Sequence, residues 1–364
     1  MNTENDAVAM LAEQAERLLE QQAGPERLKQ LLEHPGSFDR ALWEQAGDLG
    51  WPAAAIGEDQ GGFGLGFGTL NMLCEKLGAR PASLPIIPAA VVADALQRSG
   101  AENAASAELA AGTKIACIAF GEPGESGLPS APSATLRGGK LYGSKAAAPF
   151  AAVADLALCH GTVDGGVALF LVDLHQPGVT RMAIDTIDNA RASARLSFDG
   201  VSAMRIDAGD GRASVLRAAS IAAIATAFEQ VGGVRRCLDL AIAYAKQRVV
   251  FGQPIGRFQA IKHKLSDIYS ELEIARGCAT DAAAALERDS SALVPMAAMA
   301  RIGGTRAYEF ASRETIQVFG GIGVTWEAEP QHHYRRSRAL AVELGSTPFW
   351  RDLLVDDVFL LAEA

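Results

Sequence analysis

Hydrophobic residues recur at intervals of three and four along most of the chain, and the longest such pattern is interrupted once by a short turn. The turn reads F-G-Q-P-I-G over 251–256, where Pro254 lacks an amide donor and the glycines weaken a helix. Helical spacing resumes from Phe258 to Ala275, and the alanine-rich segment Ala213–Gln247 precedes the turn. So short a link predicts two neighbouring antiparallel helices.

Arg248 stands where the first of these helices is predicted to end. A guanidinium there can grip a phosphate or a carboxylate with two parallel hydrogen bonds. It can equally stabilise the helix C-terminus, where a cation is favoured. The pattern alone leaves both interpretations open.

The pattern changes twice along the chain, which predicts three domains. Residues 1–113 are mostly amphipathic helix, including 7–22, 38–49 and 69–77. Residues 206–364 return to helix. Between them, residues 114–205 carry short apolar or alternating runs bounded by Gly, Pro and Asp, which predict a small antiparallel barrel or sandwich. The predicted strands lie at 115–120, 134–136, 156–159, 167–172 and 194–198.

The glycine-rich run G-E-D-Q-G-G-F-G-L-G-F-G over 57–68 invites comparison with nucleotide-binding loops. Its spacing matches neither G-x-G-x-x-G after a strand nor G-x-x-x-x-G-K-[ST]. We interpret it as a loop that leads into a helix.

Composition excludes some classes of function but does not identify one. The chain has 364 residues and a net charge of -10, which argues against a nucleic-acid partner because such partners need a basic face. There is no basic leader and no apolar run of about 20 residues, so we expect a cytoplasmic protein without membrane spans. The cysteines form no C-x-x-C pair and are expected to be buried thiols. They are Cys74, Cys117, Cys159, Cys237 and Cys278.

His332 and His333 are adjacent, so they point to different faces of a predicted helix. No further ligands follow at metal-site spacing. We expect two surface residues and no metal site.

Two motifs carry a family resemblance. Y-A-K-Q-R-V-V-F-G-Q-P-I-G over 244–256, continued by Phe258 and Gln259, resembles the C-terminal domain of acyl-CoA dehydrogenases, and Q-V-F-G-G-I-G over 317–323 resembles that family's second flavin-binding signature. The resemblance implies a mostly α, α+β acyl-CoA dehydrogenase fold: an N-terminal helical domain, a middle antiparallel β-barrel and a C-terminal four-helix bundle. It also implies FAD as cofactor. The FAD-binding residues that it implies are Arg248, Phe251, Gln259, Gln317, Gly320 and Gly321.

The middle domain departs from the family pattern at two flavin-contacting stretches. Where the family has T-E-P-x-x-G-S-D, residues 120–127 read F-G-E-P-G-E-S-G, so Gly121 replaces a hydroxyl residue. Where the family has K-x-W-I-T-N, residues 145–150 read K-A-A-A-P-F, without the aromatic that would stack on the flavin. Both stretches are equally consistent with plain surface loops.

The family's catalytic base is also out of place. Family chemistry removes the α proton of an acyl-CoA thioester with a glutamate while the β hydride passes to the flavin. Aligned on Gly345, the chain reads V-E-L-G-S, so Leu344 occupies the base position and Glu343 comes one residue early. A shift of one residue turns a helical side chain by about 100°. The alternative family position falls near Ala222 and Ala223, and Glu229 lies about two turns beyond.

Two hypotheses follow from this resemblance. The chain could be an active, tetrameric FAD-dependent acyl-CoA dehydrogenase whose displaced base is Glu343. It could instead be the non-catalytic subunit of an α2β2 dehydrogenase, of the kind that acts on steroid side-chain thioesters, which contacts a neighbour's FAD. Either places it in fatty-acid or steroid side-chain degradation, with an acyl-CoA substrate and electron-transfer flavoprotein as acceptor. A related flavin oxidase or monooxygenase is a weaker third possibility.

Overall fold

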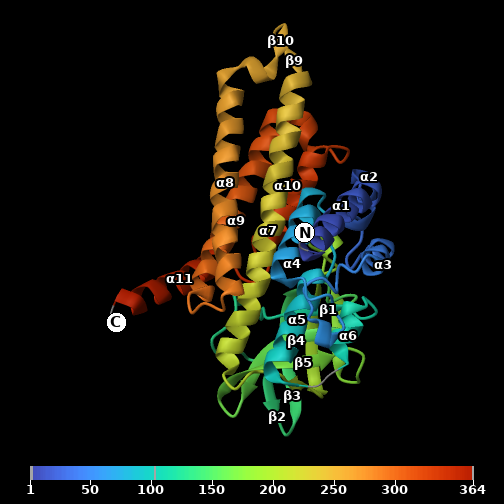
Figure 1. The fold of residues 1–364 in the computed structure, drawn as a ribbon, viewed down its shortest axis with the longest axis vertical. Coiled ribbons are helices and arrows are strands. Elements are labelled where there is room, and N and C mark those ends of the chain that lie inside the picture. The colour runs from blue at the N-terminus through green and yellow to red at the C-terminus, as the bar shows by residue number, and fades with distance from the viewer. Residues whose placement is uncertain (1–2, 102–103, 363–364) are drawn as a thin grey trace.

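The computed structural model describes residues 3–101 and 104–362, which form three successive parts (Figure 1). Helices come first, a β-sheet lies at one end of the molecule, and long helices run from the sheet to the opposite end. This is the predicted acyl-CoA dehydrogenase fold, mostly helical with a central sheet. The domain boundaries after residues 113 and 205 stay predictions.

Six helices build the described N-terminal part, and their apolar faces pack into the main core. Trp43 is 2% exposed and Trp51 is 1% exposed. The glycine-rich run forms a short 3-10 turn and a loop before α4, which agrees with the loop interpretation. The helices are α1 (Thr3–Gln22), α2 (Pro25–Leu32), α3 (Arg40–Asp48), α4 (Gly66–Ala79), α5 (Ile86–Ser99) and α6 (Ala105–Ala110).

The middle sheet has the strand order β6-β7-β3-β2-β4-β5-β8, with β1 paired to β4. It is mixed, because β4 pairs in parallel with both β1 and β2, while the other pairs are antiparallel as predicted. Its strands are β1 (Ala116–Ala119), β2 (Thr135–Arg137), β3 (Lys140–Ala148), β4 (Leu156–Val163), β5 (Gly166–Asp173), β6 (Val179–Ala183), β7 (Ala194–Val201) and β8 (Met204–Arg205).

Strand β3 is the main element that the pattern missed. Residues 145–148 belong to it, so the interpretation of this stretch as a surface loop is wrong. Lys145 is fully buried and lies 2.6 Å from a carboxylate oxygen of Glu122. A lysine among alanines gives no alternating signal, and only the distant carboxylate makes its burial possible.

The C-terminal helices are the longest elements and run side by side (Figure 1). As predicted, α7 and α8 are antiparallel neighbours joined by the hairpin β9–β10 (Val249–Val250, Gln253–Pro254). The hairpin forms the far tip of the molecule, opposite the sheet. The helices are α7 (Gly211–Gln247), α8 (Gln259–Glu287), α9 (Leu293–Phe319), α10 (Glu329–Leu340) and α11 (Thr347–Ala362).

All five cysteines are free thiols, four of them buried and Cys278 partly so. Among the described helices, none combines the length and the hydropathy needed to cross a bilayer.

Two glycines let α4 and α7 lie in close contact. A Cβ added to Gly78 would lie 1.8 Å from the carbonyl oxygen of Glu229, and one on Gly232 would lie 1.9 Å from that of Glu75. Backbone atoms cannot retreat as the end of a side chain can. The close crossing of α4 and α7 therefore fixes the position of Glu229 within the core.

We expect Gly232→Ala to lower the free energy of unfolding by about 1–3 kcal/mol, because the helices must separate to admit the methyl group. Gly277→Ala on α8 is the matched control, since nothing lies within 4 Å of the added Cβ. The control should be neutral or stabilising by up to about 1 kcal/mol. Chemical denaturation of both variants checks this, and equal stability would contradict the close crossing.

Candidate functional site

The candidate site is a cavity of about 370 Å³ between the sheet and the C-terminal helices. The sheet contributes residues from 118–128 and 146–149, the segment after β6 contributes 186–193, and the end of α10 with the following turn contributes 338–345. The two stretches that depart from the family pattern thus line one cavity with Glu343 and Leu344. The sequence could place these segments together only through the resemblance.

The sheet side of the cavity offers few functional groups. Gly121, Ala146, Ala147 and Pro149 line it, so the wall presents neither a hydroxyl nor an aromatic ring at these positions. Beneath it, burial alone would raise the pKa of Glu122, but hydrogen bonds from Lys145 and Ser133 outweigh burial and hold that pKa at about 2. The buried pair of Glu122 and Lys145 therefore holds the sheet side of the cavity in place.

Glu343, the predicted base, borders the cavity but is fully engaged. Its Oε1 accepts from Nε of Arg191 at 2.9 Å, and its Oε2 accepts from Nη2 at 2.5 Å. The side chain of Glu343 is 11% exposed and that of Arg191 is 6% exposed. A two-pronged pair of this kind is among the strongest charge-assisted contacts, and it occupies the oxygens that would take a proton.

Leu344, at the family's base position, has a positive φ of 59°, which is uncommon outside glycine. It lines a second, mostly apolar pocket with Phe150, Ala222 and Thr226, whose volume is only about 30 Å³. That is room for roughly one or two waters. The small residues near Ala222 therefore do not open space for a bulky acyl group.

Arg191 and Glu343 belong to a larger buried network. The Nη1 of Arg191 also donates to Glu229 at 3.2 Å, and Glu229 accepts from Arg336 at 3.0 Å. Glu229 is 3% exposed and Arg336 is 0% exposed. One feature of the sequence indicates this network: Glu229 is an isolated acid in an apolar stretch of α7, so a buried partner is expected for it.

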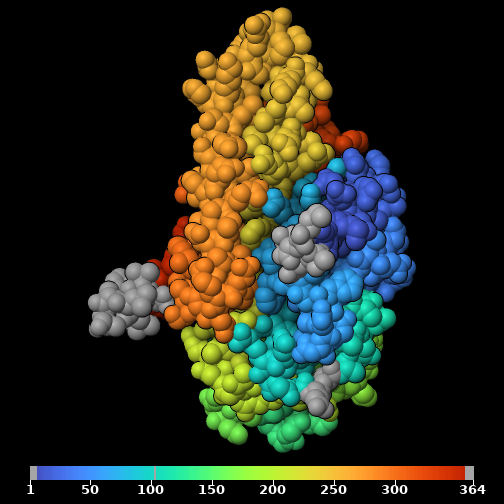
Figure 2. Space-filling model, in the orientation of Figure 1, coloured from blue at the N-terminus to red at the C-terminus, as the bar shows by residue number. Residues whose placement is uncertain are grey.

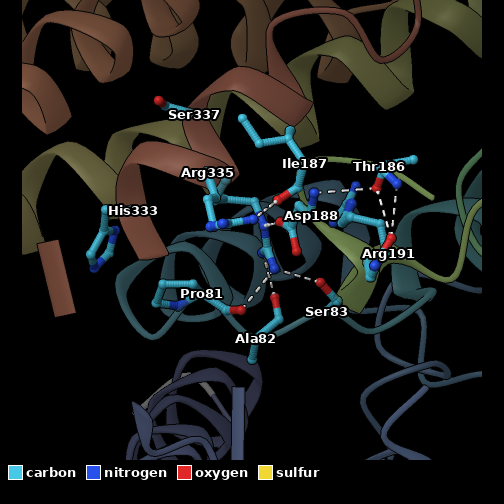
Figure 3. Close-up of polar contacts among 12 residues, drawn as sticks. Pro81, Ala82, Ser83, Thr186, Ile187, Asp188, Arg191, His333, Arg335 and Ser337 are labelled. Carbon is cyan, nitrogen blue, oxygen red and sulfur yellow. Dashed lines mark hydrogen bonds and ion pairs between the residues drawn. The ribbon is translucent and has the colours of Figure 1, made fainter. Parts of the chain in front are cut away.

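Arg336 joins all three parts of the chain. Figure 3 labels its partners Pro81, Ala82, Ser83 and Asp188. It donates to the carbonyl oxygens of Pro81 and Ala82 at 2.8 and 2.9 Å and to Ser83 Oγ at 2.7 Å. It also forms a short ion pair with Asp188, which is 2% exposed. The guanidinium thus links the loop after α4, the segment after β6 and helix α7.

Arg301 secures the turn that carries Glu343. It donates to the carbonyl oxygens of Leu340 and Glu343, the latter at 2.8 Å, and to Thr305 Oγ1 at 2.6 Å. Burial lowers the pKa of Arg301 to about 10, and the nearby carboxylates of Glu343 and Glu229 oppose that shift. The turn is therefore held through its backbone as well as through its side chain.

The prediction that His332 and His333 lie on the surface is wrong. They are 1% and 0% exposed, and His333 Nδ1 is 2.8 Å from the hydroxyl of Tyr308. Burial lowers the pKa of both imidazoles. Helix α10 is enclosed on more than one face, which its polar composition concealed. Among the described residues, no group of three or more His, Cys, Asp or Glu could hold a metal ion.

The predicted FAD-binding residues lie elsewhere, at the exposed tip of the C-terminal helices (Figure 1). Arg248 caps α7 and is exposed, with no ion pair or side-chain hydrogen bond to the described part of the chain. Phe251 is 91% exposed at a positive φ of 51°, and Gln259 is exposed at the start of α8. In the space-filling view this tip stands clear of the N-terminal helices (Figure 2).

The second predicted signature meets the first at the same tip. Gln317, Gly320 and Gly321 are exposed, and nothing lies within 4 Å of a Cβ added to either glycine. The neighbouring Phe319 stacks on Tyr244 with ring centroids 4.1 Å apart. The structure therefore brings the six residues toward one exposed surface. That surface fits an anionic, partly aromatic group presented from outside, because it offers a free guanidinium, a free ring and open backbone.

Comparisons of the sequence and of the structure both find acyl-CoA dehydrogenases. Residues 5–111 match the acyl-CoA dehydrogenase N-terminal domain and residues 209–358 match the C-terminal domain. The chain is 29% identical over 337 residues to acyl-CoA dehydrogenase IpdE2 of Mycolicibacterium smegmatis, covering 92% of this chain and 94% of the relative.

Two solved structures are similar over nearly their whole length. A variant of the Tcur3481-Tcur3483 steroid ACAD superposes with a TM-score of 0.92 at 27% identity, covering 99% of this chain and 100% of the other. The ChsE4-ChsE5 complex of Mycobacterium tuberculosis gives a TM-score of 0.86 at 25% identity, with 98% of each chain covered.

We expect Arg336→Met to lower the free energy of unfolding by about 3–5 kcal/mol, because it leaves Asp188 and Glu229 short of a buried counter-charge. Arg306→Met is the control, since Arg306 is 73% exposed in its pair with Glu271. An exposed pair contributes at most about 1 kcal/mol. Denaturant unfolding measures both, and similar losses would contradict a central role for Arg336.

Proposed function

The chain belongs to the acyl-CoA dehydrogenase family, and from that premise we propose that it is the non-catalytic subunit of a heteromeric acyl-CoA dehydrogenase. In this proposal it assembles with a homologous subunit that carries its own glutamate base. Its contribution is to complete that partner's FAD site. The reaction of the assembly is the α,β-dehydrogenation of an acyl-CoA thioester.

The observation that carries the proposal is the state of Glu343. A general base needs an oxygen within reach of the substrate proton. Both oxygens of Glu343 are instead bonded to Arg191, and the neighbouring Leu344 has no proton-accepting group. Among the described residues that line the small pocket, Glu343 is the only carboxylate.

The exposed tip supplies the other half of the argument. FAD, when bound, provides the hydride acceptor of the reaction, and this chain's residues provide contacts to it. In the proposal, Arg248 pairs with the pyrophosphate, Phe251 packs on the cofactor, and Gln259 with Gln317 donates hydrogen bonds. The open backbone of Gly320 and Gly321 lets the cofactor approach closely. These residues lie on the β9–β10 hairpin and at the helix ends beside it, whereas the cavity is lined by the sheet and the end of α10, so they suit a cofactor held by another subunit.

The comparisons agree with a heteromeric assembly, since two similar structures are named as pairs of different proteins, one of them a steroid ACAD. We extend this to a steroid or similarly large acyl group for the assembly. The family resemblance adds electron-transfer flavoprotein as the acceptor, and the composition adds a cytoplasmic location.

One observation favours a second candidate, a self-sufficient dehydrogenase whose base is Glu343. This residue borders the 370 Å³ cavity and is not wholly buried, so release from Arg191 would expose it to a bound ligand. The first candidate remains our proposal because that release would leave Arg191 with Glu229 as its remaining carboxylate partner.

We expect the chain purified alone to contain little FAD, and the complex with a homologous base-bearing subunit from the same organism to contain FAD and activity. Arg248→Ala should then reduce FAD per complex, because the pyrophosphate loses a two-pronged partner. Arg257→Ala in the same turn is the control, since Arg257 is also exposed. Visible absorbance quantifies the FAD. A full complement in the lone chain, bleached by acyl-CoA, would refute the proposal.

Glu343→Gln separates the two candidates. Under the proposal the complex keeps its activity per bound FAD and loses thermal stability, because Arg191 loses a counter-charge. If Glu343 were the base, activity would fall by roughly a hundredfold or more while the flavin spectrum stayed intact. Steady-state turnover with a dye acceptor, normalised to FAD, measures this difference.

A further inference from the structure

Two cavities of this chain share one wall. The large cavity of about 370 Å³ and the small apolar pocket of about 30 Å³ are both lined by the same residues. These are Ile118, Pro149, Arg191, Glu343 and Leu344. The long polar side chains in this wall are Arg191 and Glu343, so their ion pair lies where the two spaces would otherwise join.

The pair is held from several sides. Arg191 uses Nε and Nη2 on Glu343 and Nη1 on Glu229, so each guanidinium nitrogen has a carboxylate partner. Its guanidinium carbon also lies 5.0 Å from the ring centroid of Phe150, at cation–π distance. Breaking such a buried pair leaves uncompensated charge, which makes it a fixed part of the wall.

The backbone is strained next to both members of the ion pair. Ala192 follows Arg191 with a φ of 46°, and Leu344 follows Glu343 with a φ of 59°. Phe150, with a φ of 64°, donates its amide to the carbonyl oxygen of Arg191 at 2.7 Å. Such conformations are unfavourable for residues other than glycine and persist only where the surroundings fix them.

We propose that the Arg191–Glu343 pair is a fixed partition that keeps the acyl group of a thioester out of this chain's own site. This inference rests on the proposed non-catalytic role and gives it a physical cause. The pair thereby separates the large cavity from the small apolar pocket. Acyl-CoA is then directed to the partner subunit, because among the described residues the pair separates the cavity from the apolar pocket that would continue it.

Binding of acyl-CoA and of free coenzyme A to the full chain tests the partition by isothermal titration. The probes are butyryl-CoA, octanoyl-CoA and coenzyme A. For the wild-type chain we expect equal dissociation constants for all three, because the pair keeps the acyl group from the small apolar pocket. A preference of about tenfold or more for either acyl-CoA would overturn the inference, and this measurement needs no variant to fold.

The double variant Arg191→Ala with Glu343→Ala should open the wall, and it removes one charge of each sign. We expect it to prefer octanoyl-CoA over coenzyme A by at least about tenfold, since several methylene groups become buried. Arg191→Met with Glu343→Gln is the matched control, because it keeps the filled volume and should show no preference. If the folded alanine variant also shows no preference, the pair is not the partition.

The outcomes separate this inference from the function on which it rests. Activity that requires the partner, together with wild-type preference for acyl-CoA, would refute the partition and leave the partner role standing. Flavin bleaching by acyl-CoA in the lone wild-type chain would refute both. Circular dichroism and the thermal midpoint establish that each variant is folded before it is titrated.

Discussion

The structure depends on a buried ionic network in which every guanidinium must find acceptors from a different part of the chain. Arg336 binds the loop after α4, Asp188 beside the sheet and Glu229 on α7. Arg191 then links Glu229 to Glu343. Charges buried to this degree are tolerated only when paired and hydrogen-bonded, so the three parts of the fold cannot shift independently.

This network, more than the residue type at any single position, explains why the oxygens of Glu343 are already bonded. A carboxylate that neutralises a buried arginine is committed to the fold, and the oxygens it would need for proton transfer are already bonded. Glu343 is in that position. Leu344 has no proton-accepting group, and the ion pair beside it engages both oxygens of the neighbouring carboxylate, Glu343.

Helices and most strands were predictable because each depends on local periodicity. The turn at 251–256, the antiparallel pair α7 and α8 and the alternating runs of the sheet followed from spacing alone. The errors concern burial that depends on distant partners. The surface prediction for His332 and His333 was wrong, because adjacency places them on different faces of α10 and both of those faces are buried. Arg336 is itself buried against residues 148 and 254 positions away. Such pairings leave no trace in a single sequence.

The exposed tip and the cavity lie apart, so residues of one can be substituted without disturbing those of the other. The tip residues are exposed and make few contacts within the chain, so keeping or losing them costs little stability. The cavity residues are coupled through buried charges, so altering one alters its partners. A subunit that needs only to contact a cofactor held elsewhere can therefore retain Arg248 and Phe251 while its own site is rebuilt as structure. Under the proposed contact role, selection would act on the tip residues and leave the buried site free to change.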